Sequence, residues 1–421
     1  MNYLTPIIAI IGCLLVASRK PIYGLCTYLV ISIWYPYGLG TVSLGSIDFS
    51  AGRIVILLLF FKIFFGTKLV NNFKFVWLDR FVIILFIAEI VAGLTTIPAI
   101  DLIENRAGDF FDMALPYFAV RLVVTDRDKL LILLKTIAWS SSVLAIFGIH
   151  ESLTGENLLA FGRILSKPEL RLNLYRAQTT LRNSIYYGVY SAMAGALTIG
   201  LLKSIVANKK KIYKILIFLC FLGCFSAMSS GGLLAMVGSL AFIAFFNYRH
   251  SWKNALVVIV IMCLMVEIIS NRHFYDVIDR ICFNSATAWY RARLFEVAFF
   301  EGGMKGHWFF GYGFEDPGWG MKINMLPFTD MVNLKLCRYG LIGFIPFSAV
   351  IILAINYLLD VFRRITNVGD QWIVWCVAAS LLGVLLTMNS VSLFGMPMTL
   401  LFMVFGICGS VQLLFTDLVI K

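Results

Sequence analysis

The sequence predicts an all-α polytopic membrane protein, and three observations support this class. Of the 421 residues, 60% are hydrophobic, compared with roughly 45–50% in soluble proteins. Only 14% of the residues are charged. The apolar residues also form long runs, and a helix needs about 20 of them to cross the hydrocarbon core of a bilayer. We therefore expect about 12–13 transmembrane helices in one membrane domain that covers residues 1–421.

Each expected span is an apolar run bounded by charged or polar segments. Six runs precede the first long polar segment, four follow it, and three follow the second long polar segment. The spans lie near residues 3–18, 21–37, 50–66, 81–98, 108–123, 130–149, 184–202, 212–227, 229–247, 254–270, 327–358, 371–388 and 393–415.

Basic clusters lie at alternate junctions between these spans and define one cytoplasmic face by the positive-inside rule. With thirteen spans, this rule places the N-terminus outside and the C-terminus inside. The net charge of +12 is then a topogenic signal and an attraction to anionic membrane lipids, so it does not predict a nucleic-acid partner. The clusters are Arg19 and Lys20; Lys68, Lys74 and Arg80; Arg127 and Lys129; Lys209, Lys210, Lys211 and Lys214; Arg249 and Lys253; and Arg363 and Arg364.

The same threading places two long basic loops, residues 151–183 and 271–325, outside the cytoplasm. Topology does not require positive charge on that side. Because an arginine fork binds phosphate oxygens bidentately and keeps its charge, these loops predict a site for an anionic, lipid-linked phosphate. Their basic residues are Arg163, Lys167, Arg171, Arg176, Arg182, Arg272, Arg280, Arg291, Arg293 and Lys305.

The second loop contains a stretch, residues 285–301, that suits a short helix. Arg291 and Arg293 lie about 200° apart around such a helix, so they cannot serve one pocket. Arg293 can pair with Glu296 three residues further on. Arg291 then either reaches inward or forms a surface ion pair, and the sequence leaves both possibilities open.

A glycine-rich run follows at residues 311–320. It lacks the GxxxxGK[ST] pattern and no predicted strand precedes it, so it does not indicate a nucleotide site. We expect turns that fold the loop back over the membrane mouth. The four histidines are scattered, without metal-ligand spacing, so no metal or other cofactor is predicted.

Four stretches within residues 170–345 resemble, in order and in placement, the O-antigen ligase and polymerase family. These integral-membrane enzymes handle undecaprenyl-pyrophosphate-linked glycans. The resemblance implies a helical glycosyltransferase (GT-C-like) fold in the bacterial cytoplasmic membrane, with an active site that faces outward. The stretches are residues 175–188 (YRAQTTLRNSIYYG), residues 225–235 (FSAMSSGGLLA), Tyr290-Arg291 followed by Gly311-Tyr312-Gly313, and Asp330 followed by residues 338–344 (RYGLIGF).

The resemblance also implies roles for individual residues. Arginines of the external loops hold the donor pyrophosphate in this family, and the matching positions are Arg176 and Arg291, followed by Arg182 and Arg280. Ligases of the family carry a His-Asn pair where this chain has Thr329 and Asp330. Asp330 could accept the proton of the attacking hydroxyl and be catalytic together with Arg291. Alternatively, it caps the helix that is expected to begin near Met331.

The function implied by the resemblance is that of a polysaccharide polymerase. It would transfer a glycan from an undecaprenyl-pyrophosphate donor to a hydroxyl of a lipid-linked acceptor glycan, with fixed arginines and no metal ion stabilising the leaving pyrophosphate. A chain-length regulator is the implied protein partner. A ligase that uses a lipid or protein acceptor is the first alternative, although the missing histidine counts against it.

A membrane transporter is the second alternative. It predicts paired ionisable residues buried in spans, or broken half-helices with weak repeat symmetry. Glu89 and Glu267 are the main charges within the expected spans, and no internal repeat is visible in the sequence.

Overall fold

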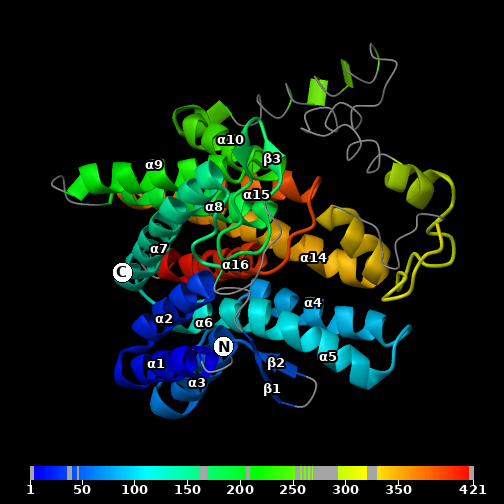
Figure 1. The fold of residues 1–421 in the computed structure, drawn as a ribbon, viewed down its shortest axis with the longest axis horizontal. Helices are drawn as coiled ribbons and strands as arrows, with labels where there is room; N and C mark the ends of the chain where they lie inside the picture. The colour runs from blue at the N-terminus through cyan, green and yellow to red at the C-terminus, as the bar shows by residue number, and fades with distance from the viewer. Residues whose placement is uncertain are drawn as a thin grey trace.

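The structure, a computed structural model, describes residues 4–35, 40–44, 47–160, 168–204, 209–251, 293–319 and 330–416, together with six isolated positions between 257 and 268. Helices dominate it (Figure 1). In this part of the chain, five helical segments are long and apolar enough to cross a membrane. They are α7 (Arg127–Thr154), the segment Ser230–Arg249 that contains α10 (Ser230–Ala244), α14 (Met331–Arg364), α15 (Val368–Met388) and α16 (Met396–Thr416).

The chain is therefore a helical polytopic membrane protein, as the composition predicts. Six shorter helices coincide with predicted spans and complete the apolar part of the fold. They are α1 (Leu4–Ser18), α2 (Pro21–Trp34), α3 (Ala51–Gly66), α4 (Trp77–Gly93), α8 (Ser184–Leu201) and α9 (Lys210–Ser226). Most of the predicted span 254–270 and most of the predicted helix 285–301 lie outside the described residues.

The structure differs from the predicted elements in two places. The predicted span 108–123 is the last part of a longer helical segment, which consists of α5 (Ala99–Asp109), the π-helix η1 (Phe110–Ala114) and α6 (Leu115–Val123). Two short antiparallel hairpins also interrupt the all-α pattern, because chain reversals outside the spans allow strand pairing. Their strands are β1 (Val42–Leu44) with β2 (Ile47–Phe49), and β3 (Leu170–Arg171) with β4 (Leu174–Tyr175).

Side-chain caps set several helix boundaries. At the start of α7, the Asp126 carboxylate accepts a hydrogen bond from the Lys129 amide at 2.9 Å. At the start of α8, the Asn183 side chain accepts one from the Ile185 amide at 2.8 Å. Such caps satisfy amides that have no partner within the first helical turn. The end of α7 is marked by Gly155, whose φ of 76° lies in the left-handed region.

The helices form two groups, which Figure 1 shows one above the other. Helices α1 to α6 form the lower group, and α7 to α16 form the upper group. The pairs α14 with α4 and α16 with α6 pack together and join the two groups. The cluster of polar side chains described below therefore lies where α14 meets the lower group.

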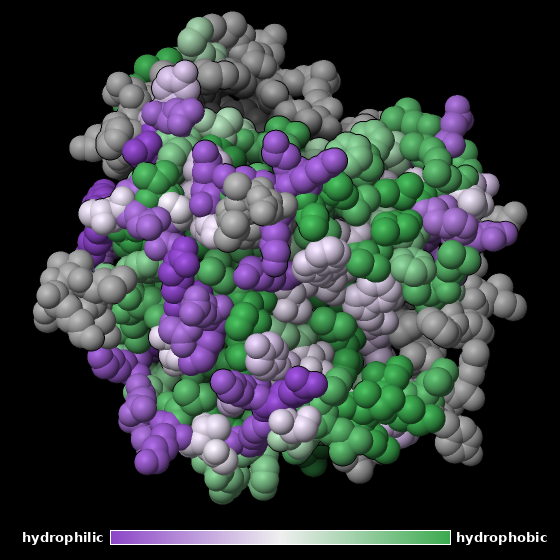
Figure 2. All heavy atoms as spheres, turned by 90° about the vertical axis from the view of Figure 1, so that its left-hand side faces the viewer, coloured by the Kyte–Doolittle hydropathy of each residue, from purple (hydrophilic) through white to green (hydrophobic). Residues whose placement is uncertain are grey.

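The two ends of α14 differ in character. Its last turn carries the basic residues Arg363 and Arg364, one of the basic clusters from which the positive-inside rule predicts the cytoplasmic face. Figure 2 views the molecule from the side on which Figure 1 marks the C-terminus, and hydrophilic side chains form a band across this face. The first turns of α14 lie at the opposite end, beside a cavity.

Candidate functional site

A cavity of 270 Å³ lies between α5, η1, the first turns of α14 and the start of α16. Its polar lining combines cations with carboxylates, and its apolar lining includes aromatic and methionine side chains. We call this space the cavity. Its lining residues are Asn105, Arg106, Asp109, Asp112, Met113, Phe314, Met331, Leu334, Lys335, Arg338, Tyr339, Leu393, Phe394, Gly395 and Met398.

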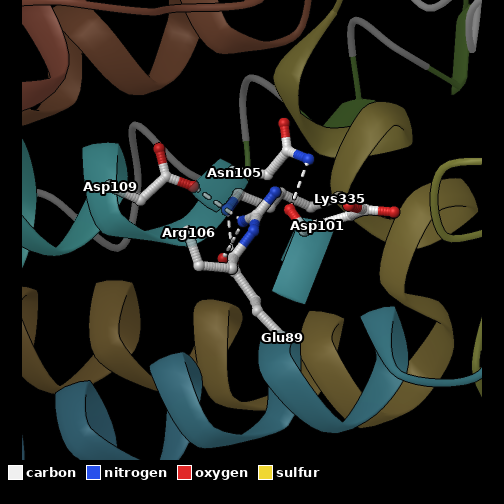
Figure 3. A network of polar contacts seen from close by, with 6 residues as sticks. All are labelled: Glu89, Asp101, Asn105, Arg106, Asp109 and Lys335. Atoms are coloured by element: carbon white, nitrogen blue, oxygen red, sulfur yellow. Dashed lines mark hydrogen bonds and ion pairs between the residues drawn. The ribbon is translucent and has the colours of Figure 1, made fainter. Parts of the chain in front are cut away.

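Glu89 of α4 lies beside the cavity lining and connects two of its cations (Figure 3). One carboxylate oxygen accepts a hydrogen bond from Lys335 Nζ of α14, and the other lies 3.1 Å from Arg106 Nη1 of α5. Arg106 Nη1 also lies 2.7 Å from the Asp109 carboxylate. The side chain of Glu89 is 2% exposed, so its charge is compensated by these two cations and not by water.

Arg338 of α14 differs from the other cations of the cavity. Among the residues that the structure describes, it forms no ion pair, and its buried Nε has no hydrogen-bond partner. Its guanidinium carbon lies 5.2 Å from the ring centroid of Phe314, and Arg106 approaches the same ring at 5.2 Å. Arg338 therefore brings a fixed positive charge and free hydrogen-bond donors to the cavity wall.

The two carboxylates of the lining have different partners. Asp112 accepts two hydrogen bonds from Arg53 of α3, at 3.1 Å from Nε and 2.6 Å from Nη2. This bidentate pair occupies both oxygens of Asp112. Among the described residues, Asp109 forms an ion pair with Arg106 alone, and its side chain is 31% exposed. Only one oxygen of Asp109 is used in this pair, so Asp109 is the lining carboxylate with an oxygen left unpaired among the described residues.

α14 is broken beside the cavity at Gly340, whose φ of 58° and ψ of −163° are not helical. A loop from the second predicted external segment fills the break. The amides of Tyr312 and Gly313 donate to the carbonyls of Cys337 and Arg338, both at 2.8 Å. Backbone groups released by the break are therefore paired with the loop, as an apolar environment requires.

The same loop continues the pairing on the other side of the break. The amide of Leu341 donates to the Trp308 carbonyl at 2.8 Å, and that of Ile342 donates to the Phe309 carbonyl at 3.2 Å. A Cβ at position 340 would collide with the Phe309 carbonyl. The glycine motif 311–313 and the Gly340 motif thus meet in space, and the described part of the glycine-rich run lies against α14.

Asp330 stands at the N-terminus of α14. Its carboxylate accepts a hydrogen bond from the Asn333 amide at 2.8 Å, and Asn333 Nδ2 donates to its other oxygen at 3.2 Å. This is the helix cap that the sequence allowed as one of two roles for Asp330. The next residue, Met331, lines the cavity, but Asp330 is not among the lining residues.

Arg176 lies in the first predicted loop, just after the β3–β4 hairpin. It pairs with Glu169 at 2.5 Å, and its Nε is buried without a hydrogen-bond partner. The hydrogen bond and the charge of Arg176 lower the pKa of the Glu169 carboxyl. The hairpin is held by Arg171, which donates to the Met228 carbonyl at 3.0 Å. Arg176 does not line the cavity.

Arg182 is exposed and has a φ of 68°. Its charge acts on Tyr186, whose ring lies 6.4 Å from that of Phe394, a residue of the cavity lining. Arg182 does not line the cavity. The other two predicted arginine ligands, Arg280 and Arg291, lie outside the described residues.

Other expectations from the sequence can also be compared with the structure. The predicted pairing of Arg293 with Glu296 is confirmed at 3.2 Å, and Glu301 is a second partner. Near the Ser229 turn, a Cβ on Gly232 of α10 would lie 2.8 Å from the Gly188 Cα of α8. The small residues of this motif thus allow α10 to pack closely against α8.

Three cations of the cavity, Arg106, Lys335 and Arg338, were not predicted as ligands. A signal was present in the sequence, because Lys335 and Arg338 lie three residues apart near the start of an apolar run and so share one helix face. Ionisable residues within a membrane span indicate a functional site by themselves. Among the described residues, no group of three or more His, Cys, Asp or Glu side chains could hold a metal ion.

Comparison of the chain with protein-family models and with curated proteins finds no match. The geometry of the cavity and the sequence motifs around it are therefore the basis for assigning a function.

Proposed function

We propose that the protein is a membrane glycosyltransferase, a polysaccharide polymerase that uses an undecaprenyl-pyrophosphate-linked donor, and that the cavity receives the diphosphate of this donor. The observation that carries the proposal is the free guanidinium of Arg338 in a cavity wall that also contains Lys335 and Arg106. Guanidinium forks and ammonium groups are the usual protein ligands of phosphate oxygens.

The position of the cavity supports this assignment. It lies at the N-terminal ends of α14 and α16, whereas the basic residues Arg363 and Arg364 end α14 on the opposite side. By the positive-inside rule, the cavity then opens on the outer face of the bacterial cytoplasmic membrane. A lipid-linked donor on the outer leaflet could bring its diphosphate to the cavity while its polyprenyl chain stays in the bilayer.

The size of the cavity supports a small head group. Pockets that enclose a drug-sized ligand measure about 300–1,000 Å³, and the cavity has 270 Å³. A diphosphate fits such a volume, whereas a glycan of several sugars has to remain in the space above it. The reacting bond, between the anomeric carbon and the phosphate oxygen, would then lie at the mouth of the cavity.

The proposed reaction uses the residues of the cavity in the following way. The acceptor hydroxyl attacks the anomeric carbon, the bond to the diphosphate oxygen breaks, and the lipid-linked diphosphate leaves with the bonding electrons. Arg338, Lys335 and Arg106 stabilise the negative charge that develops on the leaving oxygen. Asp109, the carboxylate with an unpaired oxygen, accepts the proton of the hydroxyl. Asp330 then has the role of a helix cap.

In vitro glycan elongation tests the proposal. Purified protein is incubated with its native undecaprenyl-pyrophosphate-linked repeat units, and the products are resolved by length. We expect a ladder with the wild type, loss of the ladder with Arg338→Ala, and an unchanged ladder with Arg293→Ala, which removes an exposed arginine of the loop. Transfer of a single glycan to a lipid or protein acceptor, with no ladder, would instead establish the ligase alternative.

A transporter remains a second candidate, because the structure contains two features that this class predicts. Glu89 and Lys335 form a buried ion pair between α4 and α14, and α14 is broken at Gly340. A flux assay of the same lipid-linked substrate in proteoliposomes separates the two candidates. Substrate movement in the absence of any glycan transfer would favour transport.

A further inference from the structure

We infer that Glu89 is a positioning residue that makes the cavity selective for a diphosphate over a monophosphate. The inference rests on the proposed function, since it concerns the ligand of the same cavity. Glu89 does not line the cavity. It is 1% exposed as a residue, so a ligand in the cavity would meet the cations that Glu89 holds and not Glu89 itself.

The geometry of Glu89 is that of a two-ended clamp (Figure 3). Its two oxygens contact cations from two different elements, Lys335 of α14 and Arg106 of α5. Both nitrogens are thereby held within contact of one carboxylate, at a fixed separation of a few ångströms. Two neighbouring phosphate groups of one ligand match two cations at such a separation, whereas a single phosphate gains less from it.

The clamp leaves donors available for a ligand. An ammonium group has three N–H donors, and Glu89 is the one hydrogen-bond partner of Lys335 Nζ among the described residues. The guanidinium of Arg106 has five donors; Nη1 contacts Glu89 and Asp109, and Nε is enclosed by the protein, which leaves the Nη2 donors for a ligand. Both cations line the cavity, so the remaining donors can serve an anion there.

The charges also balance in a way that suits an anionic ligand. Arg106, Lys335 and Arg338 contribute three positive charges, Glu89 and Asp109 contribute two negative charges, and Asp112 is neutralised by Arg53. Together these groups carry one positive charge in excess. Glu89 reduces the repulsion among the cations from the side away from the cavity, so the cavity itself remains open to the ligand.

Glu89→Gln separates this role from a merely structural one. The glutamine amide has one acceptor oxygen in place of two, and its NH₂ group faces a cation, so either Lys335 or Arg106 loses its fixed position. If Glu89 only crosslinks α4, α5 and α14, Glu89→Gln lowers the thermal stability and leaves the ratio of the affinities for pyrophosphate and phosphate unchanged. A positioning role predicts that the ratio itself changes.

The test uses the full-length protein in lipid nanodiscs, titrated by calorimetry with inorganic pyrophosphate and, separately, with inorganic phosphate. We expect the wild type to prefer pyrophosphate, and the preference to fall by about tenfold in Glu89→Gln, which is the worth of one charge-assisted hydrogen bond. Glu104→Gln makes the same chemical change at an exposed position of α5 and should leave the preference unchanged. Glu89→Asp keeps the charge with a shorter reach and should give an intermediate preference.

A double variant shows whether Glu89 acts through its partner. In a Lys335→Met background, Glu89→Gln should lower the remaining preference by less than it does in the wild type, because one end of the clamp is already missing. An unchanged preference in both Glu89→Gln and Glu89→Asp would overturn the inference and leave the proposed function standing. Failure of the wild type to bind pyrophosphate would overturn the proposed function together with the inference.

Discussion

Helix α4 carries two buried carboxylates that form ion pairs, and their surroundings differ in whether the cavity lies beside them. Asp79, in the first turn, forms a closed cluster with Tyr117 and Arg121. Glu89, about 15 Å further along the helix axis, belongs to an open cluster with Arg106, Asp109, Lys335 and Arg338. Both clusters lie among apolar helices. The open cluster borders the cavity, whereas Asp79, Tyr117 and Arg121 are not among its lining residues.

The closed cluster has its hydrogen-bonding capacity occupied. The Asp79 oxygens accept hydrogen bonds from Arg121 Nε at 2.7 Å, Arg121 Nη2 at 2.9 Å, the Tyr117 hydroxyl at 2.6 Å and the Val76 amide at 2.8 Å. Arg121 Nη2 also reaches the Lys74 carbonyl at 3.0 Å. In the open cluster, by contrast, the Nε atoms of Arg106 and Arg338 have no partner. A buried charge thus indicates a ligand site when donors remain free beside a space that a ligand can fill.

The largest effect that we predict concerns the stability of the closed cluster. Asp79→Ala should lower the free energy of unfolding by about 3–5 kcal/mol, because it leaves the guanidinium of Arg121 buried without a counter-ion. Chemical unfolding in detergent micelles, followed by tryptophan fluorescence, measures this change. Asp101→Ala, at an exposed position of α5, should change it by less than about 0.5 kcal/mol. Equal stabilities of the two variants would show that the closed cluster is not structural.

The open cluster should respond in the opposite way, with a large loss of activity and a small loss of stability. Arg338→Ala should reduce kcat/KM for glycan elongation by about 10²–10³, the usual effect of removing one donor that stabilises developing charge. Its unfolding free energy should fall by no more than about 1 kcal/mol, the worth of its contact with Phe314. Arg338→Lys keeps the charge but loses the fork, so an intermediate rate is expected. A rate within a factor of two of the wild type in Arg338→Ala would remove this arginine from the proposed site.

A third prediction tests the connection between the external loop and the open cluster. Gly340→Ala should cost about 1–3 kcal/mol, because its backbone conformation is one that only glycine adopts readily, and the added Cβ would also collide with the Phe309 carbonyl. Because the Arg338 carbonyl is bound by the Gly313 amide, elongation should decrease as well.

Gly302→Ala is the matched control for this prediction. Gly302 also has a positive φ of 83°, but nothing lies within 4 Å of the added Cβ. It should therefore show the smaller backbone cost and normal elongation. Thermal unfolding and product ladders compare the two variants. Equal losses of activity would mean that backbone strain in the loop, and not the α14 break, is responsible.

Much of the fold could be predicted from the sequence, because the spans are long apolar runs and most of them are bounded by charged or polar residues. The exception is α5, in which Asp101, Glu104, Asn105, Arg106 and Asp109 interrupt the apolar pattern. These polar side chains are accommodated because α5 lies at the end of the bundle, where Arg106 and Asp109 face the cavity. Hydropathy alone cannot reveal a helix of this kind.

The site was harder to predict, because its residues come from elements that are distant in the sequence. Lys335 and Glu89 are 246 residues apart in the chain, and no local pattern connects them. The motif around Gly340 is visible in the sequence. The sequence nevertheless predicts ligands in the two external loops, because positive charge there is not required by the topology. The sequence does not reveal that Arg338 keeps free donors while Lys335, three residues earlier, is paired. Only the three-dimensional packing distinguishes these two cations.

The smallest predicted effect concerns Arg176, and it tests whether the first external loop or the open cluster binds the diphosphate. Arg176→Ala removes an arginine that already has a carboxylate partner, Glu169, whose side chain is 63% exposed. An exposed pair of this kind contributes about 0–1 kcal/mol, so we expect a small loss of stability and an elongation rate close to that of the wild type. The sign of its pH dependence also follows. Because Arg176 lowers the pKa of Glu169 in the folded state, the pair stabilises the fold above the ordinary pKa of glutamate, and this contribution disappears as the pH falls through the lowered value.

Glu169→Gln is the matched variant, because it removes the same pair from the other side and keeps Arg176 in place. If Arg176 serves only the hairpin, both variants lose the same small stability at neutral pH, lose nothing at a pH below the lowered pKa, and elongate glycans normally. If Arg176 instead holds the diphosphate, Arg176→Ala abolishes the ladder while Glu169→Gln leaves it intact or improves it, because a competing carboxylate has been removed. The second result would move the diphosphate from the open cluster to the first external loop, and it would make the free donors of Arg338 a feature of packing alone.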